Sequence, residues 1–174
     1  GDVAHVDDVD VALDVRGNPA AQEVHDHRRR RAGVHVPRPD RDRRVDDHHV
    51  EAAWIPLPDG RSLPAWFHLP PGYAGGRVPV VVSLPGMDSF KEMSVALYGD
   101  RWLSRGMAVL ALDGPGQYES PVLDIYFSLA AWTATGTAAV DWLTARPEVD
   151  PARIGLSGNS FGSFFGTLAA AHEP

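Results

Sequence analysis

Residues 153–162 read Arg-Ile-Gly-Leu-Ser-Gly-Asn-Ser-Phe-Gly, and this pattern constrains the architecture of the whole chain. A short apolar run leads into Gly158-x-Ser160-x-Gly162, and apolar residues then recur at helical spacing as far as Ala169. This order predicts a strand, a sharp turn and a helix, with Ser160 at the turn in a strained backbone conformation. Glycine on both sides of the serine lets the strand and the helix approach closely. An ordinary serine in a structural turn is the alternative interpretation.

A helix that begins directly after Ser160 would also supply chemistry. The N-terminus of a helix favours negative charge, so it would stabilise charge that develops beside the serine hydroxyl. The backbone N–H of Phe161 would then point at an oxyanion forming on a bound substrate. The pattern therefore predicts Ser160 as a nucleophile and Phe161 as a backbone donor.

Composition excludes several classes of protein. The chain has 174 residues, which is enough for one domain with a hydrophobic core, and its net charge of −7 argues against a general nucleic-acid binder. Cysteine is absent, which excludes a disulfide framework, a thiolate nucleophile and a cysteine metal site. We expect no cofactor and no metal. We also expect no membrane span, because the apolar runs are too short to cross a bilayer. The acidic N-terminus has no signal-peptide pattern, which predicts a cytoplasmic protein.

The first 49 residues differ in composition from the rest. Every Trp, Tyr, Phe, Ile and Met follows residue 50, so residues 1–49 offer too little apolar area to offset the entropy of ordering them. Apart from Asn18, all their codons can begin with G or C. We therefore predict that residues 1–49 are disordered or come from a wrong reading frame. A metal-binding or nucleic-acid-binding arm at residues 25–31 is the alternative, but its two histidines are not at metal-ligand spacing.

From residue 50 onward, strand patterns alternate with helix patterns. Residues 50–57 and 63–69, on either side of a Pro-Asp-Gly turn, predict an antiparallel hairpin. Further strands are predicted over residues 78–84, 107–112 and 153–157, and helices over residues 93–105, 125–146 and from 161. This alternation predicts a parallel α/β sheet with right-handed crossovers. Met87, Asp113 and Ser160 would lie at the carboxyl ends of its strands, where such sheets bind ligands.

Three stretches together resemble the α/β-hydrolase fold. They are Leu-Pro-Gly-Met-Asp-Ser-Phe-Lys-Glu at 84–92, Arg-Gly-Met-Ala-Val-Leu-Ala-Leu-Asp-Gly-Pro-Gly-Gln at 105–117, and the stretch at 153–162. They are similar to the branch that contains 2,6-dihydroxypseudooxynicotine hydrolase and esterase-like proteins. The resemblance implies that residues 50–174 are the N-terminal half of such a domain. The implied sheet is mostly parallel, with an N-terminal antiparallel hairpin, and is incomplete at its C-terminus.

The resemblance also implies roles for individual residues. Ser160 would be the nucleophile, and the backbone N–H groups of Phe161 and Met87 would form the oxyanion hole. Asp88 falls where a carbon–carbon hydrolase of the branch has an acidic residue near its substrate, and a loop cap is the alternative. Asp113 is expected to be a structural loop residue, because the acid of the family comes later in the chain.

Four further residues carry expectations. Lys91 and Glu92 are expected either to form a surface pair or to help set the conformation of the loop. Tyr118 stands where glycine is more usual in the family. The fold orders its triad as serine, acid, histidine. His172 is the only histidine of this sequence that follows Ser160, and it would lie roughly 18 Å away along the same helix.

Without a histidine in reach, we expect this chain alone to lack the acid and the base and to be an inactive fragment of a longer enzyme. The parent protein is predicted to be a serine hydrolase that cleaves a carboxylic ester in a small-molecule acyl substrate through an acyl-enzyme. Carbon–carbon or peptide hydrolysis on the same fold, or a truncated protein without catalysis, are the alternatives. No pattern indicates an oligomeric state.

Overall fold

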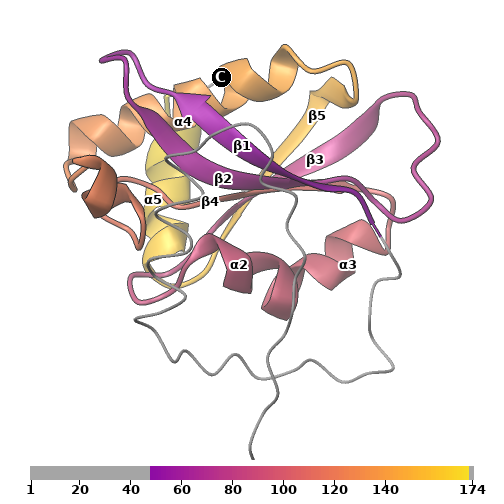
Figure 1. The fold of residues 1–174 in the computed structure, drawn as a ribbon, viewed down its shortest axis with the longest axis horizontal. Coiled ribbons are helices and arrows are strands. Elements are labelled where there is room, and N and C mark those ends of the chain that lie inside the picture. Colours follow the sequence, from indigo (N-terminus) through magenta and orange to yellow (C-terminus); the bar gives the residue numbers. More distant parts are fainter. Residues whose placement is uncertain (1–47, 173–174) are drawn as a thin grey trace, which may run out of the picture.

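The computed structural model describes residues 48–172, which form a five-stranded sheet between two layers of helices (Figure 1). The strands are β1 (Val50–Pro56), β2 (Ser62–His68), β3 (Val78–Leu84), β4 (Ala108–Leu112) and β5 (Val149–Gly158), in the spatial order β1-β2-β4-β3-β5. β2 pairs antiparallel with β1 and β4, whereas β3 pairs parallel with β4 and β5. The predicted α/β class, with an antiparallel hairpin ahead of a parallel sheet, is confirmed. The prediction for residues 1–49 lies almost wholly outside the described residues.

The strands follow from the apolar runs of the sequence. All five residues of β4 are buried, as are the last five of β3, because helices cover both faces of the sheet at these strands. β5 differs, since it lies at an edge of the sheet and half of its residues are exposed, including Leu156. No helix within residues 48–172 has the length and apolar character that crossing a membrane requires.

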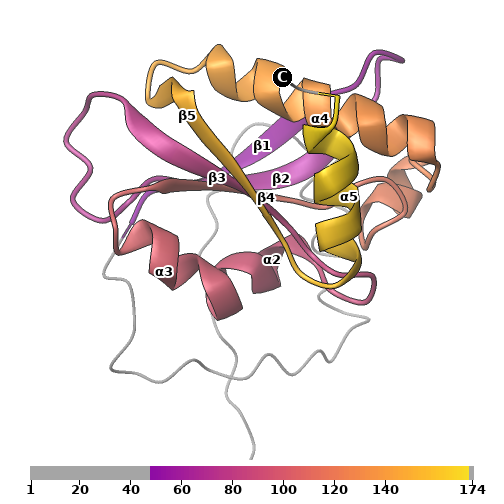
Figure 2. The ribbon, with the colours of Figure 1, turned by 180° about the vertical axis from the view of Figure 1, so that it is seen from behind.

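The helices divide between the two faces of the sheet. Figures 1 and 2 show α2 (Lys91–Met93) and α3 (Asp100–Leu103) on one face, joined by the π-helical segment η2 (Ser94–Gly99). The long helix α4 (Leu129–Thr144) lies on the other face and packs against α5 (Phe161–Ala170). This arrangement brings the loops after β3, β4 and β5 to one edge of the sheet.

Two predicted helix boundaries are wrong. The helix expected over residues 93–105 begins two residues earlier, where the Lys91 backbone N–H donates to Asp113 Oδ1 at 2.7 Å, and it is interrupted by η2. The helix expected over residues 125–146 begins only at Leu129, where Ser128 caps it by accepting a hydrogen bond from the Ala131 N–H at 3.0 Å. Ile125 matches the helical period but is buried just after the 3-10 turn η3 (Ser120–Leu123).

Candidate active site

Ser160 occupies the turn between β5 and α5. Its backbone angles are φ 54° and ψ −122°, so a non-glycine residue adopts a conformation that normally suits glycine. Such a conformation costs of order 1–3 kcal/mol and persists only where the surroundings enforce it. The side chain is exposed, as the sequence predicts for a serine raised above the sheet.

Two glycines allow the chain to close around this turn. A Cβ atom on Gly158 would overlap the carbonyl group of Gly162, and one on Gly162 would lie 2.7 Å from the Pro85 carbonyl oxygen. The Ser163 hydroxyl donates to the Gly158 carbonyl oxygen at 2.8 Å and ties the helix back to the strand. The expected close approach of strand and helix is therefore confirmed.

The loop that follows β3 lies against the Ser160 turn. A Cβ atom on Gly86 would be 3.4 Å from the Ser160 Cβ and 3.2 Å from the Asn159 carbonyl oxygen. The structure thus brings Gly86, the residue before Met87, next to Asn159 and Ser160. The side chains of Met87 and Asp88 are exposed on this loop. The catalytic roles of these residues, and that of Asp88 near a substrate, stay predictions.

Gln117, which was not among the predicted site residues, reaches from the loop after β4 to the loop after β3. Its Nε2 donates to the carbonyl oxygens of Pro85 at 2.9 Å and Gly86 at 3.0 Å, and its Oε1 accepts from the Gly114 N–H at 2.9 Å. The Asp-Gly-Pro-Gly-Gln motif contains this residue, but the motif alone does not reveal which carbonyl groups the amide would meet.

Lys91 is the centre of a buried charged cluster. Its Nζ lies 2.7 Å from Glu119 Oε2 and 3.0 Å from both Asp113 Oδ2 and Glu92 Oε1, although the lysine side chain is only 2% exposed. The Lys91 backbone N–H also donates to Asp113 Oδ1 at 2.7 Å. Lys91 is therefore not part of a surface pair, and the alternative that it sets the loop is confirmed. The structural role predicted for Asp113 is confirmed as well.

Three carboxyl groups share one ammonium in this cluster, and the pKa values of Asp113 and Lys91 are shifted. Burial raises the pKa of Asp113 to about 7, against the opposing effect of Lys91 and with the support of Glu92 and Glu119. Burial by itself would lower the pKa of Lys91, but the three carboxylates outweigh it and hold that pKa above its usual value. Lys91 therefore stays charged while Asp113 takes up a proton near neutral pH.

We expect Asp113 to make a contribution to the free energy of unfolding that falls as the pH rises from about 4 to about 7, while buried His68, with a pKa lowered to about 3, contributes in the opposite sense below pH 6.5. Folded Asp113, with its pKa of about 7, retains a proton that the unfolded chain loses near 3.8, so the folded state binds more protons in this window. Urea unfolding at a series of pH values should show this contribution as the difference between the unsubstituted protein and Asp113→Asn, whose stability should rise more steeply with pH. Asp59→Asn is the control, because Arg61 keeps the pKa of Asp59 below 3.8 and outside the window. An equal slope with and without Asp113 would contradict the expectation.

Tyr118 covers the cluster from outside. It adopts a positive φ of 34°, which explains why glycine is more usual at this position. Its ring stacks on Phe90 with centroids 4.7 Å apart, and the Lys91 Nζ lies 5.7 Å from its centroid. These contacts offset the backbone strain, so the loop keeps its shape with a tyrosine in place of glycine.

None of the histidines in residues 48–172 lies at the edge of the sheet that carries Ser160. His68 pairs with Val50 of β1 and Val109 of β4, which places it near the amino end of β4, and its Nδ1 lies 3.0 Å from His48 Nε2. Burial lowers the pKa of His68 to about 3, as expected for a core imidazole. His172 follows the far end of α5, where its Nδ1 contacts the Leu168 carbonyl oxygen.

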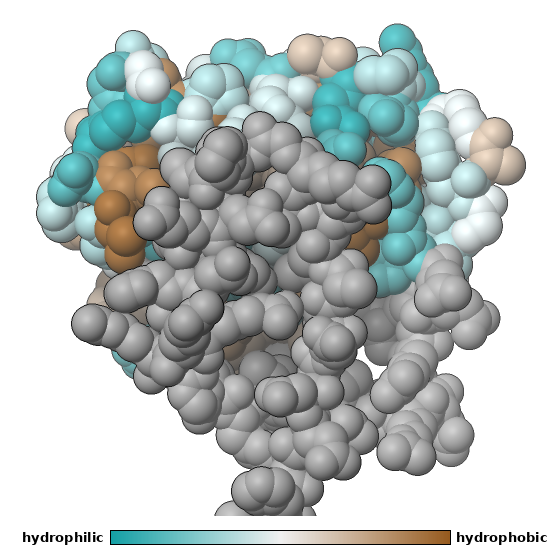
Figure 3. Space-filling model, viewed as in Figure 1, coloured by the Kyte–Doolittle hydropathy of each residue, from teal (hydrophilic) through white to brown (hydrophobic). Residues whose placement is uncertain are grey.

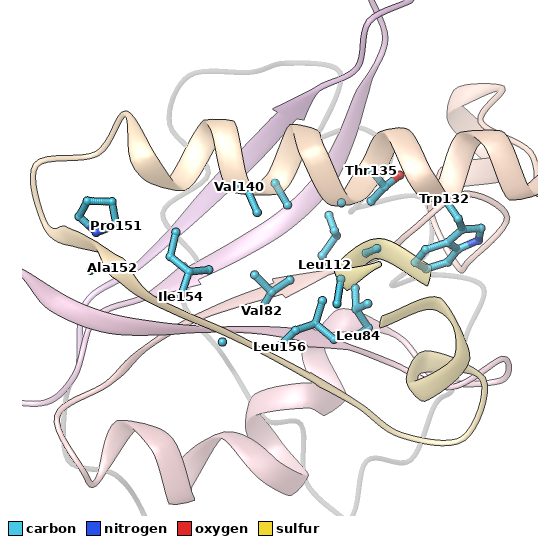
Figure 4. Close-up of a pocket in the computed structure, with 15 residues that line it drawn as sticks. Val82, Leu84, Leu112, Trp132, Thr135, Val140, Pro151, Ala152, Ile154 and Leu156 are labelled. Atoms are coloured by element: carbon cyan, nitrogen blue, oxygen red, sulfur yellow. The ribbon is translucent and has the colours of Figure 1, made fainter. Parts of the chain in front are cut away.

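An apolar cavity of about 520 Å³ lies between the sheet and α4 (Figure 4). The lining residues labelled in the figure come from β3, β4, β5 and α4. They are Val82, Leu84, Leu112, Trp132, Thr135, Val140, Pro151, Ala152, Ile154 and Leu156. The hydroxyl of Thr135 donates to the Ala131 carbonyl oxygen at 2.8 Å, so it offers no donor to a ligand. Neither Ser160 nor Met87 lines this cavity, and it is therefore separate from the candidate active site.

Aromatic side chains gather beside Ser160. Phe165 is buried and stacks on Trp132, with ring centroids 3.9 Å apart, while the partly exposed rings of Phe127, Phe161 and Phe164 lie 5.5–5.8 Å from Phe165. Figure 3 shows a hydrophobic area at the left of the drawn face, where α5 and the segment before α4 lie in Figure 1.

The sequence model of the family described as X-Pro dipeptidyl-peptidase (S15 family) matches residues 24–174. Alpha/beta hydrolase xenA of Xenoacremonium sinensis is 35% identical over 136 residues, which are 74% of this chain and 32% of that protein. The 2,6-dihydropseudooxynicotine hydrolase of Paenarthrobacter nicotinovorans is 35% identical over 117 residues, or 67% of this chain and 30% of the relative. The chain spans about a third of the length of the curated relatives it matches.

Solved structures give the same grouping. The 2,6-dihydroxy-pseudo-oxynicotine hydrolase superposes with a TM-score of 0.62 at 31% identity, covering 72% of this chain and 34% of that one. A cold-adapted esterase from an Arctic intertidal metagenomic library superposes with a TM-score of 0.60 at 23% identity, covering 75% of this chain and 58% of the esterase. The second likeness shows a shared fold alone.

Proposed function

Because the chain belongs to the X-Pro dipeptidyl-peptidase (S15) family of α/β-hydrolases, we propose that it is a hydrolase whose nucleophile is Ser160. The predicted fold and branch are confirmed by the relatives, which are themselves hydrolases. The observation that carries the proposal is the strained backbone of Ser160 between β5 and α5, directly against the loop of Gly86. Strain of this kind is retained where a site needs it.

The proposed reaction proceeds through an acyl-enzyme. The Ser160 hydroxyl attacks the carbonyl carbon of the substrate and gives its proton to a base. The N–H groups of Phe161 and Met87 stabilise the oxyanion that forms, and its collapse expels the leaving group. The base returns its proton to the leaving group. It then takes a proton from a water molecule that attacks the acyl carbon, and passes this proton to the Ser160 oxygen as the acid product leaves. We expect a histidine base from outside residues 48–172, since the histidines described there lie away from Ser160.

A carboxylic ester of a small molecule is the proposed substrate class. The aromatic rings beside Ser160 favour an apolar acyl or leaving group, and an ester demands no machinery beyond the nucleophile, the oxyanion hole and the base. Cleavage of a carbon–carbon bond by the same route is the alternative favoured by the exposed carboxylate of Asp88 on the adjoining loop. Cleavage of a peptide bond is the alternative suggested by the family description.

The test is carried out with the full-length protein from the gene that contains this sequence. A fluorophosphonate probe should label Ser160, and short p-nitrophenyl esters should be hydrolysed. Ser160→Ala should abolish labelling and lower kcat by about 10⁴-fold or more. Ser157→Ala is the matched control, because Ser157 lies three residues earlier in β5 and should leave both readouts intact. Undiminished labelling or hydrolysis in folded Ser160→Ala would contradict the proposal.

A further inference from the structure

The buried amide of Gln117 has one permitted orientation. The residue is 4% exposed, and its side chain makes three hydrogen bonds to backbone groups of Pro85, Gly86 and Gly114. Turning the amide over would place Oε1 against two carbonyl oxygens and Nε2 against an N–H group. Because each partner accepts only the observed atom, the amide is held in a single orientation.

The Gly86 carbonyl and the Met87 N–H belong to the same peptide group. The peptide is trans and planar, so its C=O and its N–H point in opposite directions. Gln117 holds the carbonyl oxygen at 3.0 Å, and Gly86 packs against the Ser160 turn. We propose that Gln117 is a positioning residue, which directs the Met87 N–H at the oxyanion that forms on the substrate at Ser160. The inference rests on the proposed function, and Gln117 itself does not touch the substrate.

Further hydrogen bonds leave this peptide little freedom. The Gly86 carbonyl oxygen also accepts from the Ser89 N–H at 3.2 Å, so both of its lone pairs are used. At the other end of the loop, the Lys91 N–H donates to Asp113 at 2.7 Å. The loop that carries Met87 is thus tied on both sides to the loop after β4. Rotation of the Met87 N–H would break buried hydrogen bonds, which is costly.

An oxyanion donor acts in the transition state, so loss of its alignment should lower kcat and leave KM nearly unchanged. Gln117→Glu is the sharpest variant because it keeps the size of the side chain and an acceptor for the Gly114 N–H. Its second carboxylate oxygen would repel the Pro85 and Gly86 carbonyl oxygens. We expect kcat to fall about 10- to 100-fold, with KM within about twofold.

The pH profile of this variant separates positioning from a general structural role. A buried carboxyl group has a raised pKa, and in its protonated form it can donate a hydrogen bond to Gly86 again. The ratio of the kcat of Gln117→Glu to that of the unsubstituted protein should therefore rise as the pH falls. Gln117→Met, whose side chain has no hydrogen-bond donor at any pH, should lower kcat throughout the pH range without this recovery.

Ser120→Ala is the matched control. The Ser120 hydroxyl is buried and donates to the Asp113 carbonyl oxygen at 3.1 Å, within the same loop, but it makes no contact with Gly86. Its removal should leave kcat within about twofold, since the alignment of Met87 is untouched. All variants are assayed in the full-length protein, with thermal unfolding as a check that each is folded.

The outcomes distinguish the two proposals. If Ser160→Ala is inactive while both Gln117 variants retain kcat within about twofold, the positioning role is overturned and the nucleophile stands. A loss in Gln117→Glu that is matched by Ser120→Ala, or that shows no recovery at low pH, also overturns it. If Ser160→Ala remains active, the proposed function fails and the inference fails with it.

Discussion

Replacement of Lys91 by methionine is expected to destabilise the folded domain by about 3–5 kcal/mol. The substitution keeps the length of the side chain but removes the only ammonium group among the buried carboxyl groups of Asp113 and Glu119, whose oxygens lie 3.0 and 2.7 Å from Nζ. Without it, these groups would be left close together and uncompensated. Urea denaturation at pH 7, monitored by tryptophan fluorescence, would measure the loss.

Two further variants test whether burial of the charges, rather than the loss of an ion pair as such, causes this destabilisation. Arg153→Met removes an exposed pair with Asp150 at 2.6 Å and should cost far less stability, because solvent screens an exposed pair. Adding Asp113→Asn and Glu119→Gln to Lys91→Met should restore a large part of the stability, because the cluster then contains fewer unpaired charges. A loss in Lys91→Met no greater than that in Arg153→Met would contradict this account.

Local sequence patterns were sufficient for the elements that depend on local chemistry. The glycines around Ser160 specify a turn that few other residues permit, and the continuous apolar runs of β3 and β4 specify strands that are covered on both faces. Ile125 shows the limit of such patterns. It fits the helical period, yet tertiary packing buries it between the 3-10 turn and α4. The helix begins at Leu129 instead, with Ser128 as its N-cap.

The connections between loops could not be predicted in the same way. Lys91 and Gln117 are polar residues in polar-looking loops, and nothing in their neighbours along the chain indicates that they are buried. Their partners in the opposite loop are 22 to 32 residues away, and they meet because β3 and β4 pair in parallel and end at the same edge. The turn that carries Ser160 was therefore predictable from one motif, whereas the groups that hold the loop after β3 required the fold.

Gly158→Ala should produce the second large effect, a destabilisation of about 3 kcal/mol or more. The new methyl group would overlap the carbonyl group of Gly162 and lie 2.5 Å from the Ser163 nitrogen. These are backbone atoms at the first turn of α5, so no side-chain rotation relieves the clash. The helix would have to move away from β5 and take the Ser160 backbone with it. Labelling of Ser160 by a fluorophosphonate probe should therefore fall together with stability.

Gly155→Ala is the control for this substitution, because Gly155 belongs to the same edge strand. The nearest atom to its added Cβ would be the Val80 carbonyl oxygen at 3.9 Å, an ordinary contact. We expect a change within about 0.5 kcal/mol, on the favourable side because alanine restricts the unfolded chain more than glycine does. Equal effects of the two substitutions on urea denaturation and on labelling would mean that the strand and the helix do not meet as closely as Ser160 requires. A loss confined to Gly158→Ala would instead tie the strained conformation of the serine to the contact between two glycines.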